Sequence, residues 1–180
     1  MARVGGVYPN SGLKGFDIVL SNLNKAIMQI RHGSAQGLVL SVALIRRSTE
    51  TKPPLTPVDL GNLRASFFSE ITTLKKSGLP QIANERGTII REGRFKGPNA
   101  EKLSTGYKGT KAEAKSLVNS TNHSILAMFG YSAYYATPVH ENQEMHFQRP
   151  GAGPKWFQEA INSNSNKILQ IIRDNAAIKR

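Results

Sequence analysis

The strongest constraint on the fold is a row of large apolar residues close to the start of the chain. The row consists of Phe16, Leu20, Leu23, Ile27 and Ile30, spaced four, three, four and three positions apart. This spacing places the whole row on one face of an α-helix, because a helix completes a turn every ~3.6 residues. Polar residues such as Asn22, Lys25 and Gln29 lie away from the row. The pattern predicts an amphipathic helix that begins at Gly15.

The apolar pattern continues beyond an interruption by Gly33 and Gly37. It resumes at Leu38, Val42 and Ile45. Each glycine costs about 1 kcal/mol in a helix relative to alanine, so the middle of this segment is weak. We expect one long helix with a weak middle rather than two helices. The Pro53-Pro54 pair ends it, because proline cannot continue a helix.

Two later segments alternate apolar and polar residues, as strands with one buried face do. The first runs from Leu63 to Ile71 and the second from Ser124 to Ala136. The apolar face of the second carries Ile125, Ala127, Phe129, Tyr131, Ala133 and Tyr135. Residues 87–92 are a plausible partner strand. Residues 93–122 are polar with scattered glycines, which indicates a long loop or insertion with room for a short helix at 111–118.

A second helical pattern closes the chain after a turn rich in proline and glycine at residues 149–154. Pro154 suits the first turn of this helix. Its apolar face carries Phe157, Ile161, Ile168, Ile171, Ile172 and Ile178. The element order predicts an α+β fold: a long N-terminal helix, an antiparallel sheet with a long basic loop insertion, and a C-terminal helix packing on the sheet. We expect residues 1–14 to be a flexible arm, and residues 15–180 to form one domain with its insertion at about 93–122.

Positive charge is concentrated in the middle of the chain. The 24 Lys and Arg against 12 Asp and Glu give a net charge of +12, and residues 75–115 alone hold ten basic and four acidic residues. The candidate basic surface is formed by Arg91, Arg94, Lys96, Lys102, Lys108, Lys111 and Lys115. Such a segment is either a solvated loop or a surface that faces DNA or an acidic protein subunit.

Composition excludes several classes of protein. The chain has no cysteine, so it has neither disulfides nor thiolate metal sites. Its longest apolar stretch, residues 38–45, is far shorter than the ~20 residues that span a bilayer. Its first residues lack the apolar run of a signal peptide. We therefore expect a soluble, unsecreted protein with no membrane partner.

No pattern of catalytic residues stands out, and we expect neither an enzyme nor a bound cofactor or metal. The segment from His140 to His146 resembles a zinc site only superficially. Its two histidines are six residues apart and would lie on opposite faces of a helix, whereas zincins need them four apart on one face. A metal-dependent hydrolase built on His140, Glu141, Glu144 and His146 is one rival hypothesis, and it predicts stoichiometric bound metal. Phosphate-loop and serine-nucleophile motifs are absent from the sequence.

The segment after the first helix has the residues of a tight turn that leads into a strand. Pro57 restricts the chain as it leaves the helix, and Asp59 can accept backbone N–H bonds. Gly61 can adopt a backbone conformation that side chains disfavour. We expect Arg64 to project from the following strand, where it either belongs simply to a well-formed turn or makes an ion pair with Asp59 or with another subunit.

Two segments resemble a family of tailed-bacteriophage proteins. Leu55–Phe67 is similar to the P-x-D-T-G-x-L-R-x-S signature of phage tail-completion and tail-component proteins, with Leu60 in place of the usual Thr. The segment from Tyr131 to Glu141 resembles the family's Y-A-x-x-V-E-x-G strand end, with Asn142 where the family usually has Gly. The resemblance covers roughly residues 15–178, apart from the loop at 93–122.

This resemblance implies a structural virion protein that forms a ring, with a hexamer favoured, at the head–tail junction. Its partners would be neighbouring neck, adaptor and tail-tube proteins, with non-specific contact to genomic DNA in the channel. Its site residues would be Pro57, Asp59, Gly61, Arg64, Tyr135 and Glu141, at subunit contacts or in the turn. The protein would be located in the virion and, during assembly, in the host cytoplasm. The alternatives are a head-side adaptor, a minor capsid protein or a non-specific nucleic-acid-binding protein.

Overall fold

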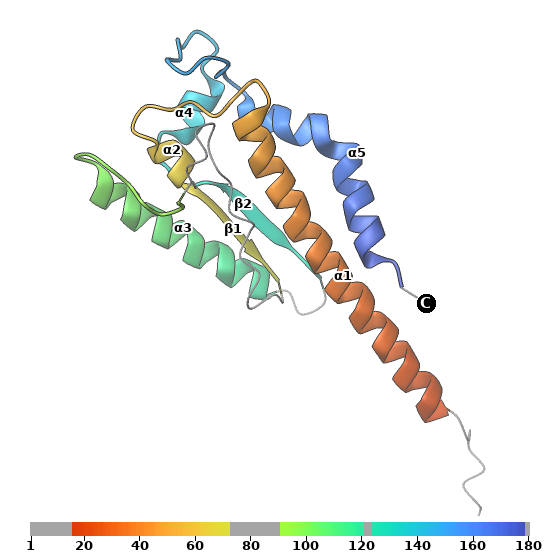
Figure 1. Ribbon diagram of the computed structural model, residues 1–180. Helices are drawn as coiled ribbons and strands as arrows, with labels where there is room; N and C mark the ends of the chain where they lie inside the picture. The colour runs from red at the N-terminus through yellow and green to blue at the C-terminus, as the bar shows by residue number, and fades with distance from the viewer. Residues whose placement is uncertain (1–15, 73–90, 121–123, 179–180) are drawn as a thin grey trace, which may run out of the picture.

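A computed structural model describes residues 16–72, 91–120 and 124–178 of the 180-residue chain (Figure 1). Its elements are α1 (Phe16–Thr51), α2 (Asn62–Ala65), β1 (Phe67–Ile71), α3 (Ala100–Ser120), β2 (Ala127–Tyr131), α4 (Ala136–Glu141) and α5 (Trp156–Ala176). The predicted α+β class, with a long first helix, an antiparallel sheet and a last helix packed on it, is confirmed. The expected arm at residues 1–14 lies outside the described residues. Among the described helices, none is both long and apolar enough to cross a membrane.

The first helix is continuous, as predicted, and its two glycines mark where α5 packs against it. A Cβ atom added at Gly33 would lie 2.0 Å from the backbone oxygen of Asn175, and one added at Gly37 would lie 2.8 Å from Cα of Ile172. The two helices run in opposite directions (Figure 1). The glycines that weaken α1 as an isolated helix therefore allow its backbone to meet that of α5.

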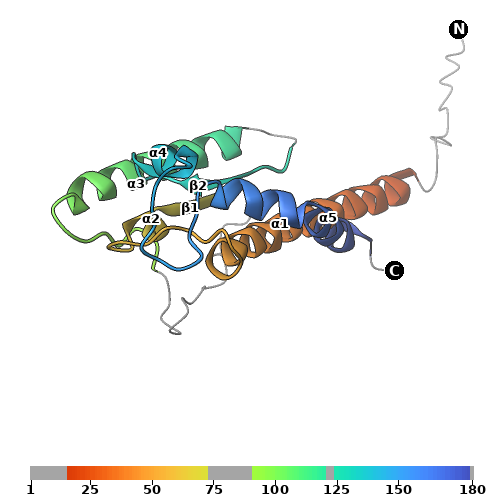
Figure 2. The same cartoon turned by 90° about the horizontal axis from the view of Figure 1, so that it is seen from above.

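The sheet consists of β1 and β2, paired antiparallel with Phe67 opposite Tyr131 and Ile71 opposite Ala127. It lies between α3 on one face and α1 on the other (Figures 1 and 2). Successive side chains of a strand point to opposite faces. Phe67 accordingly contacts α1, with the Arg46 guanidinium 4.4 Å from its ring centre, while Phe68 clusters with Tyr107 of α3.

Three local expectations were wrong. The first strand begins at Phe67 rather than Leu63, because residues 62–65 form the short helix α2. The second strand ends at Tyr131, and Ala133 and Tyr135 follow it in the turn toward α4. The predicted loop insertion at 93–122 is mostly the helix α3. The partner strand expected at 87–92 lies largely outside the described residues.

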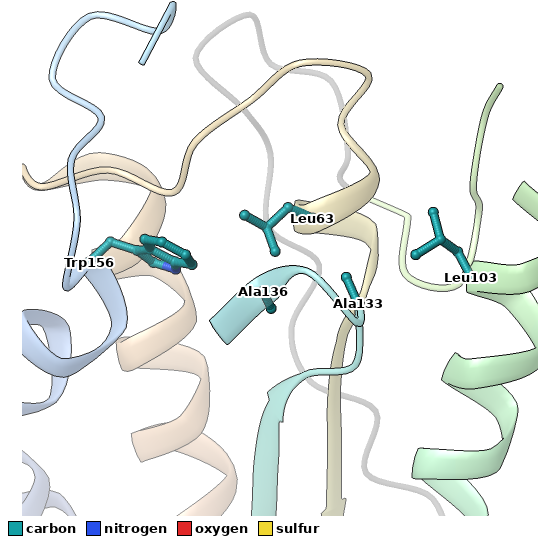
Figure 3. Close-up of a cluster of buried hydrophobic side chains, with 5 residues drawn as sticks. All are labelled: Leu63, Leu103, Ala133, Ala136 and Trp156. Carbon is teal, nitrogen blue, oxygen red and sulfur yellow. The ribbon is translucent and has the colours of Figure 1, made fainter. Parts of the chain in front are cut away.

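The main apolar core joins four helices at one end of the sheet. Its buried members are Leu63, Leu103, Ala133, Ala136 and Trp156, which Figure 3 shows converging from α2, α3, the β2–α4 turn, α4 and α5. Tyr135 and Val139 pack against this cluster from the surface side. The core thus holds together the segments before β1 and after β2, which carry the residues singled out in the sequence.

Candidate docking cleft

Glu50, in the last turn of α1, is the centre of a buried ionic network. Its side chain is fully buried, and its Oε2 accepts a hydrogen bond of 2.6 Å from Nε of Arg64 and one of 3.3 Å from Arg149. A buried carboxylate requires such partners, because losing its hydration is costly. The expected ion pair with Asp59 was therefore wrong, whereas the alternative, a contact of Arg64 with another subunit, stays a prediction. Arg64 lies on α2 rather than on a strand, and it pairs within the chain.

Arg149 fastens the proline-rich segment after β2 to the end of α1. Its guanidinium donates hydrogen bonds to the backbone oxygens of Thr56, at 2.9 Å, and Glu50, at 3.0 Å. Beside it, the amide of Leu55 donates to the oxygen of Gly151 at 2.7 Å. The first segment singled out in the sequence, residues 55–67, is thus bonded to the turn at residues 149–154.

Tyr131, at the end of β2, closes the same region from the sheet side. Its hydroxyl lies 3.1 Å from the hydroxyl oxygens of both Thr49 and Thr56. Its ring makes edge contacts with those of Trp156 and Phe157, with centres 6.0 and 5.5 Å apart. The aromatic residues expected on one face of this strand therefore form core contacts.

The turn at residues 57–62 contains the left-handed glycine that its sequence predicts. Gly61 has φ +84°, in the left-handed region that favours glycine, and leads directly into α2. The next residue, Asn62, was not anticipated as important. Its side-chain nitrogen donates to the oxygen of Lys96, and its side-chain oxygen accepts from the amide of Lys96, both at 2.8 Å. These two hydrogen bonds tie the turn to the segment before α3.

A cleft of about 520 Å³ lies between this turn, the start of α3, and α4 with the loop that follows it. It is lined by Pro57, Val58, Asp59, Leu60, Asn62, Leu63, Asn99, Leu103, Tyr134, Tyr135, Val139, Met145, His146, Phe147 and Gln148. We call this feature the docking cleft. Three of the predicted site residues, Pro57, Asp59 and Tyr135, meet in it. Gly61 and Arg64 instead shape and anchor its wall, and Glu141 lies outside the lining.

The mouth of the docking cleft combines exposed apolar groups with a few polar ones. Leu60 is 49% exposed and Tyr134 is 55% exposed, and the ammonium group of Lys102 lies 4.2 Å from the ring centre of Tyr134. Burial raises the pKa of Tyr135, and the neighbouring Tyr134 and the carboxylate of Asp59 raise it further. The Tyr135 hydroxyl therefore stays neutral at physiological pH and can donate a hydrogen bond to a bound group.

Glu141 bonds within the chain, at the junction of α4 and α5. It forms an ion pair with Lys155 and accepts a bond from Nδ1 of His140 at 2.7 Å. The hydrogen bond from Lys155 lowers the pKa of Glu141, and the bond from His140 adds to this effect. The His140 ring packs edge-on against Trp156, with centres 4.7 Å apart. Among the described residues no three His, Asp or Glu side chains are grouped as metal ligands.

The predicted basic surface is divided between α3 and the segment before it. Arg91, Arg94 and Lys96 precede the helix with exposed side chains, and Lys102, Lys108, Lys111 and Lys115 lie on it. Lys108, Lys111 and Lys115 share one side of the helix, being three and four residues apart. Of these, Lys111 lies 3.7 Å from the carboxylate of Glu70 on β1. Lys108 and Lys115 are exposed to solvent.

No family model, curated protein or solved structure matches this chain. Concave, mainly apolar sites with a few convergent polar groups bind ligands or protein segments, and aromatic residues with methionine are enriched in protein interfaces. The docking cleft has this composition, with Tyr134, Tyr135, Met145 and Phe147 around it. The arrangement suits recognition of a protein segment by shape and hydrogen bonding.

Proposed function

We propose that this chain is a structural subunit of a tailed bacteriophage, a tail-completion protein that forms a ring at the head–tail junction. The observation that carries the proposal is the docking cleft. It brings together, on one surface, the two segments that resemble the phage family, although Asp59 and Tyr135 are 76 residues apart in the chain. A neighbouring subunit or neck protein inserts a segment there, and no covalent chemistry is involved.

The hydrogen bonds and ion pairs around the cleft support a rigid docking site rather than one that changes conformation. Glu50, Arg64 and Arg149 form a buried network that includes α2, which supplies Leu63 to the cleft lining, and Asn62 fixes the turn to Lys96. A rigid, preformed recess loses little conformational entropy on binding, which favours the repeated subunit contacts of a closed ring.

A second candidate function is contact with DNA, and it is favoured by Lys108 and Lys115 on one side of α3. In a ring around the DNA channel, these side chains would face the phosphates without reading sequence. The same surface would dock on an acidic neighbour if it pointed outward. A stand-alone nucleic-acid-binding protein would use this surface alone and leave the docking cleft without a role.

Electron microscopy of the purified protein, at low and moderate salt, tests the ring directly. We expect closed rings of about six protomers seen face-on. The variant Leu60→Asp combined with Tyr134→Ala should abolish the rings, since both side chains are exposed at the cleft mouth. A protein that shows no rings at either salt concentration and binds duplex DNA tightly would overturn the proposal.

The matched control for this test is Leu117→Asp, because Leu117 is 47% exposed and lies on α3 outside the cleft lining. We expect it to form rings like the unmodified protein. Circular dichroism should show the same helix content for all three proteins. Rings that persist in the cleft double variant would mean that subunits join through another surface.

A further inference from the structure

Among the described residues, the N-terminal part of α1 extends beyond the rest of the fold and presents a bare apolar face. We call residues 17–31 the α1 arm. Leu20, Leu23, Ile27 and Ile30 are 43, 54, 44 and 39% exposed. The last helix runs back along α1 only as far as Gly33, which meets Asn175 one residue before α5 ends (Figures 1 and 2). The arm is therefore the part of α1 that α5 does not reach.

This bare face is the continuation of the contact between α1 and α5. The spacing of four and three residues that begins in the arm runs on through Ser34, Gly37 and Ser41, and Gly37 packs directly against Ile172 of α5. Small residues lie on this line where α5 covers it, and large aliphatic residues lie on it where α5 is missing. Such a row, repeating every seven residues, is the seam of a helix pair. A second helix is thus expected to cover the arm.

We propose that the α1 arm pairs antiparallel with the α1 arm of a second copy of this chain. In the register that matches the two seams, Leu20 faces Ile30 of the other molecule, and Leu23 faces Ile27. All four apolar layers are then filled. The paired stretch is about 21 Å long at ~1.5 Å per residue, so we expect a concentration-dependent contact rather than a permanent one.

The charges beside the seam select the antiparallel direction. Asp17 and Arg31 flank the apolar row on the same side, two heptads apart. In the antiparallel register each Asp17 lies next to Arg31 of the other molecule, which makes two favourable pairs about the two-fold axis. In a parallel pair, Arg31 would face Ala26 and gain no partner. Complementary flanking charges set direction and partner choice in helix pairs.

This pairing does not depend on the proposed ring, because it uses a different surface from the docking cleft. A two-fold contact joins molecules that point in opposite directions, whereas all subunits of a ring on the tail axis point the same way. Pairing in the isolated protein therefore produces dimers or, if rings form, two rings stacked face to face. In either case it doubles the mass.

Sedimentation equilibrium of the full chain over a range of concentrations tests the pairing. Leu23→Lys combined with Ile27→Lys should halve the mass of the particle, whatever the size of any ring. Asn22→Lys combined with Gln29→Lys is the control, because it adds the same charge to exposed positions away from the seam. Equal masses for the seam and control variants, with equal helix content by circular dichroism, would overturn the proposal.

A charge exchange tests the antiparallel direction. We expect Asp17→Arg and Arg31→Asp each to weaken self-association by about tenfold, because each places like charges together at both pairs. An equimolar mixture of the two variants should associate as tightly as the unmodified protein, since the mixed dimer restores opposite charges. A mixture no tighter than either variant alone would overturn the antiparallel register. The cleft variant alters a different surface, so whether it loses its rings does not affect these expected results.

Discussion

At the scale of single residues, Glu50 is held by two guanidinium groups in a place closed to solvent. Arg64 and Arg149 both contact its Oε2 atom, and the two arginines come from the segments before β1 and after β2 in the chain. Because water cannot reach this buried carboxylate, its negative charge is stabilised by its protein partners, and the loss of any one of them is costly.

Replacing Arg64 with alanine should therefore destabilise the protein strongly. We expect a loss of about 3 kcal/mol in the free energy of unfolding, since among the described residues the Glu50 carboxylate is left with the longer bond to Arg149. Urea denaturation followed by circular dichroism measures this. Arg173→Ala, at an exposed position on α5, should change the stability by less than ~0.5 kcal/mol. A similar small effect for Arg64→Ala would show that the network does not stabilise the fold.

The ion pair between Glu141 and Lys155 predicts a specific dependence on pH. The pKa of Glu141 is lowered in the folded protein, so its contribution to stability is present above the pKa of the unfolded chain. That contribution disappears as the pH falls through the lowered folded pKa. Lys155→Gln should raise the pKa of Glu141 toward its ordinary value, as measured by NMR titration of the carboxyl group. An unchanged pKa would exclude Lys155 as the principal cause.

Single residues also show what the sequence could reveal. The positive φ of Gly61 was predictable, because the need for a tight turn after Pro57 is local. The partner of Arg64 was not, since the sequence offers Asp59 nearby and gives no sign that Glu50 turns inward. Asp59 and Tyr135 come together because of the three-dimensional fold, and the spacing of residues along the chain does not predict that proximity.

At the scale of elements, two glycines in helices have opposite roles. Gly33 lies where α1 touches the backbone of α5, and an added methyl group there would collide with the oxygen of Asn175. Gly106 lies inside α3 with nothing within 4 Å of an added Cβ. The same substitution is therefore expected to change stability in different directions.

Gly33→Ala should lower the melting temperature, because α5 must move away from α1 to accept the methyl group. Gly106→Ala should raise the free energy of unfolding by about 1 kcal/mol, because alanine favours a helix without steric cost. Thermal unfolding of the two variants side by side measures the contrast. Stabilisation by both substitutions would mean that α1 and α5 are not in close contact.

The helix α3 shows why one element was misread. Gly106, Gly109 and the many polar residues suggested a loop. The buried positions Leu103, Tyr107, Ala114 and Val118 nevertheless follow a helical spacing of four, seven and four residues. That signal was present in the sequence but sparse, because only one narrow face of α3 packs on the sheet. The long apolar row of α1, in contrast, was unambiguous.

At the scale of the whole molecule, the net charge of +12 raises the question of whether α3 contacts DNA. Lys108→Gln combined with Lys115→Gln removes two exposed charges and leaves the contact between Lys111 and Glu70 intact. We expect weaker binding to duplex DNA and a shallower dependence of binding on salt, by about two phosphate contacts. Fluorescence anisotropy with DNA of random sequence measures both.

The control for this comparison is a pair of exposed basic residues on α5, Lys167→Gln combined with Arg173→Gln, which removes the same charge elsewhere. If DNA binding falls equally in both variants, the effect comes from net charge alone, and α3 is not the DNA-contacting surface. Unchanged binding in the α3 variant leads to the same conclusion.

The docking cleft also has a consequence for the order of events during synthesis. Its walls come from residues 57–63, the start of α3 and residues 134–148, while the Arg149 bonds and the Trp156 core contact follow still later in the chain. A ribosome must therefore have released most of the polypeptide before any recess exists. Until then a growing chain has no cleft with which to capture a neighbour, so contacts through the docking cleft cannot form before each subunit has folded.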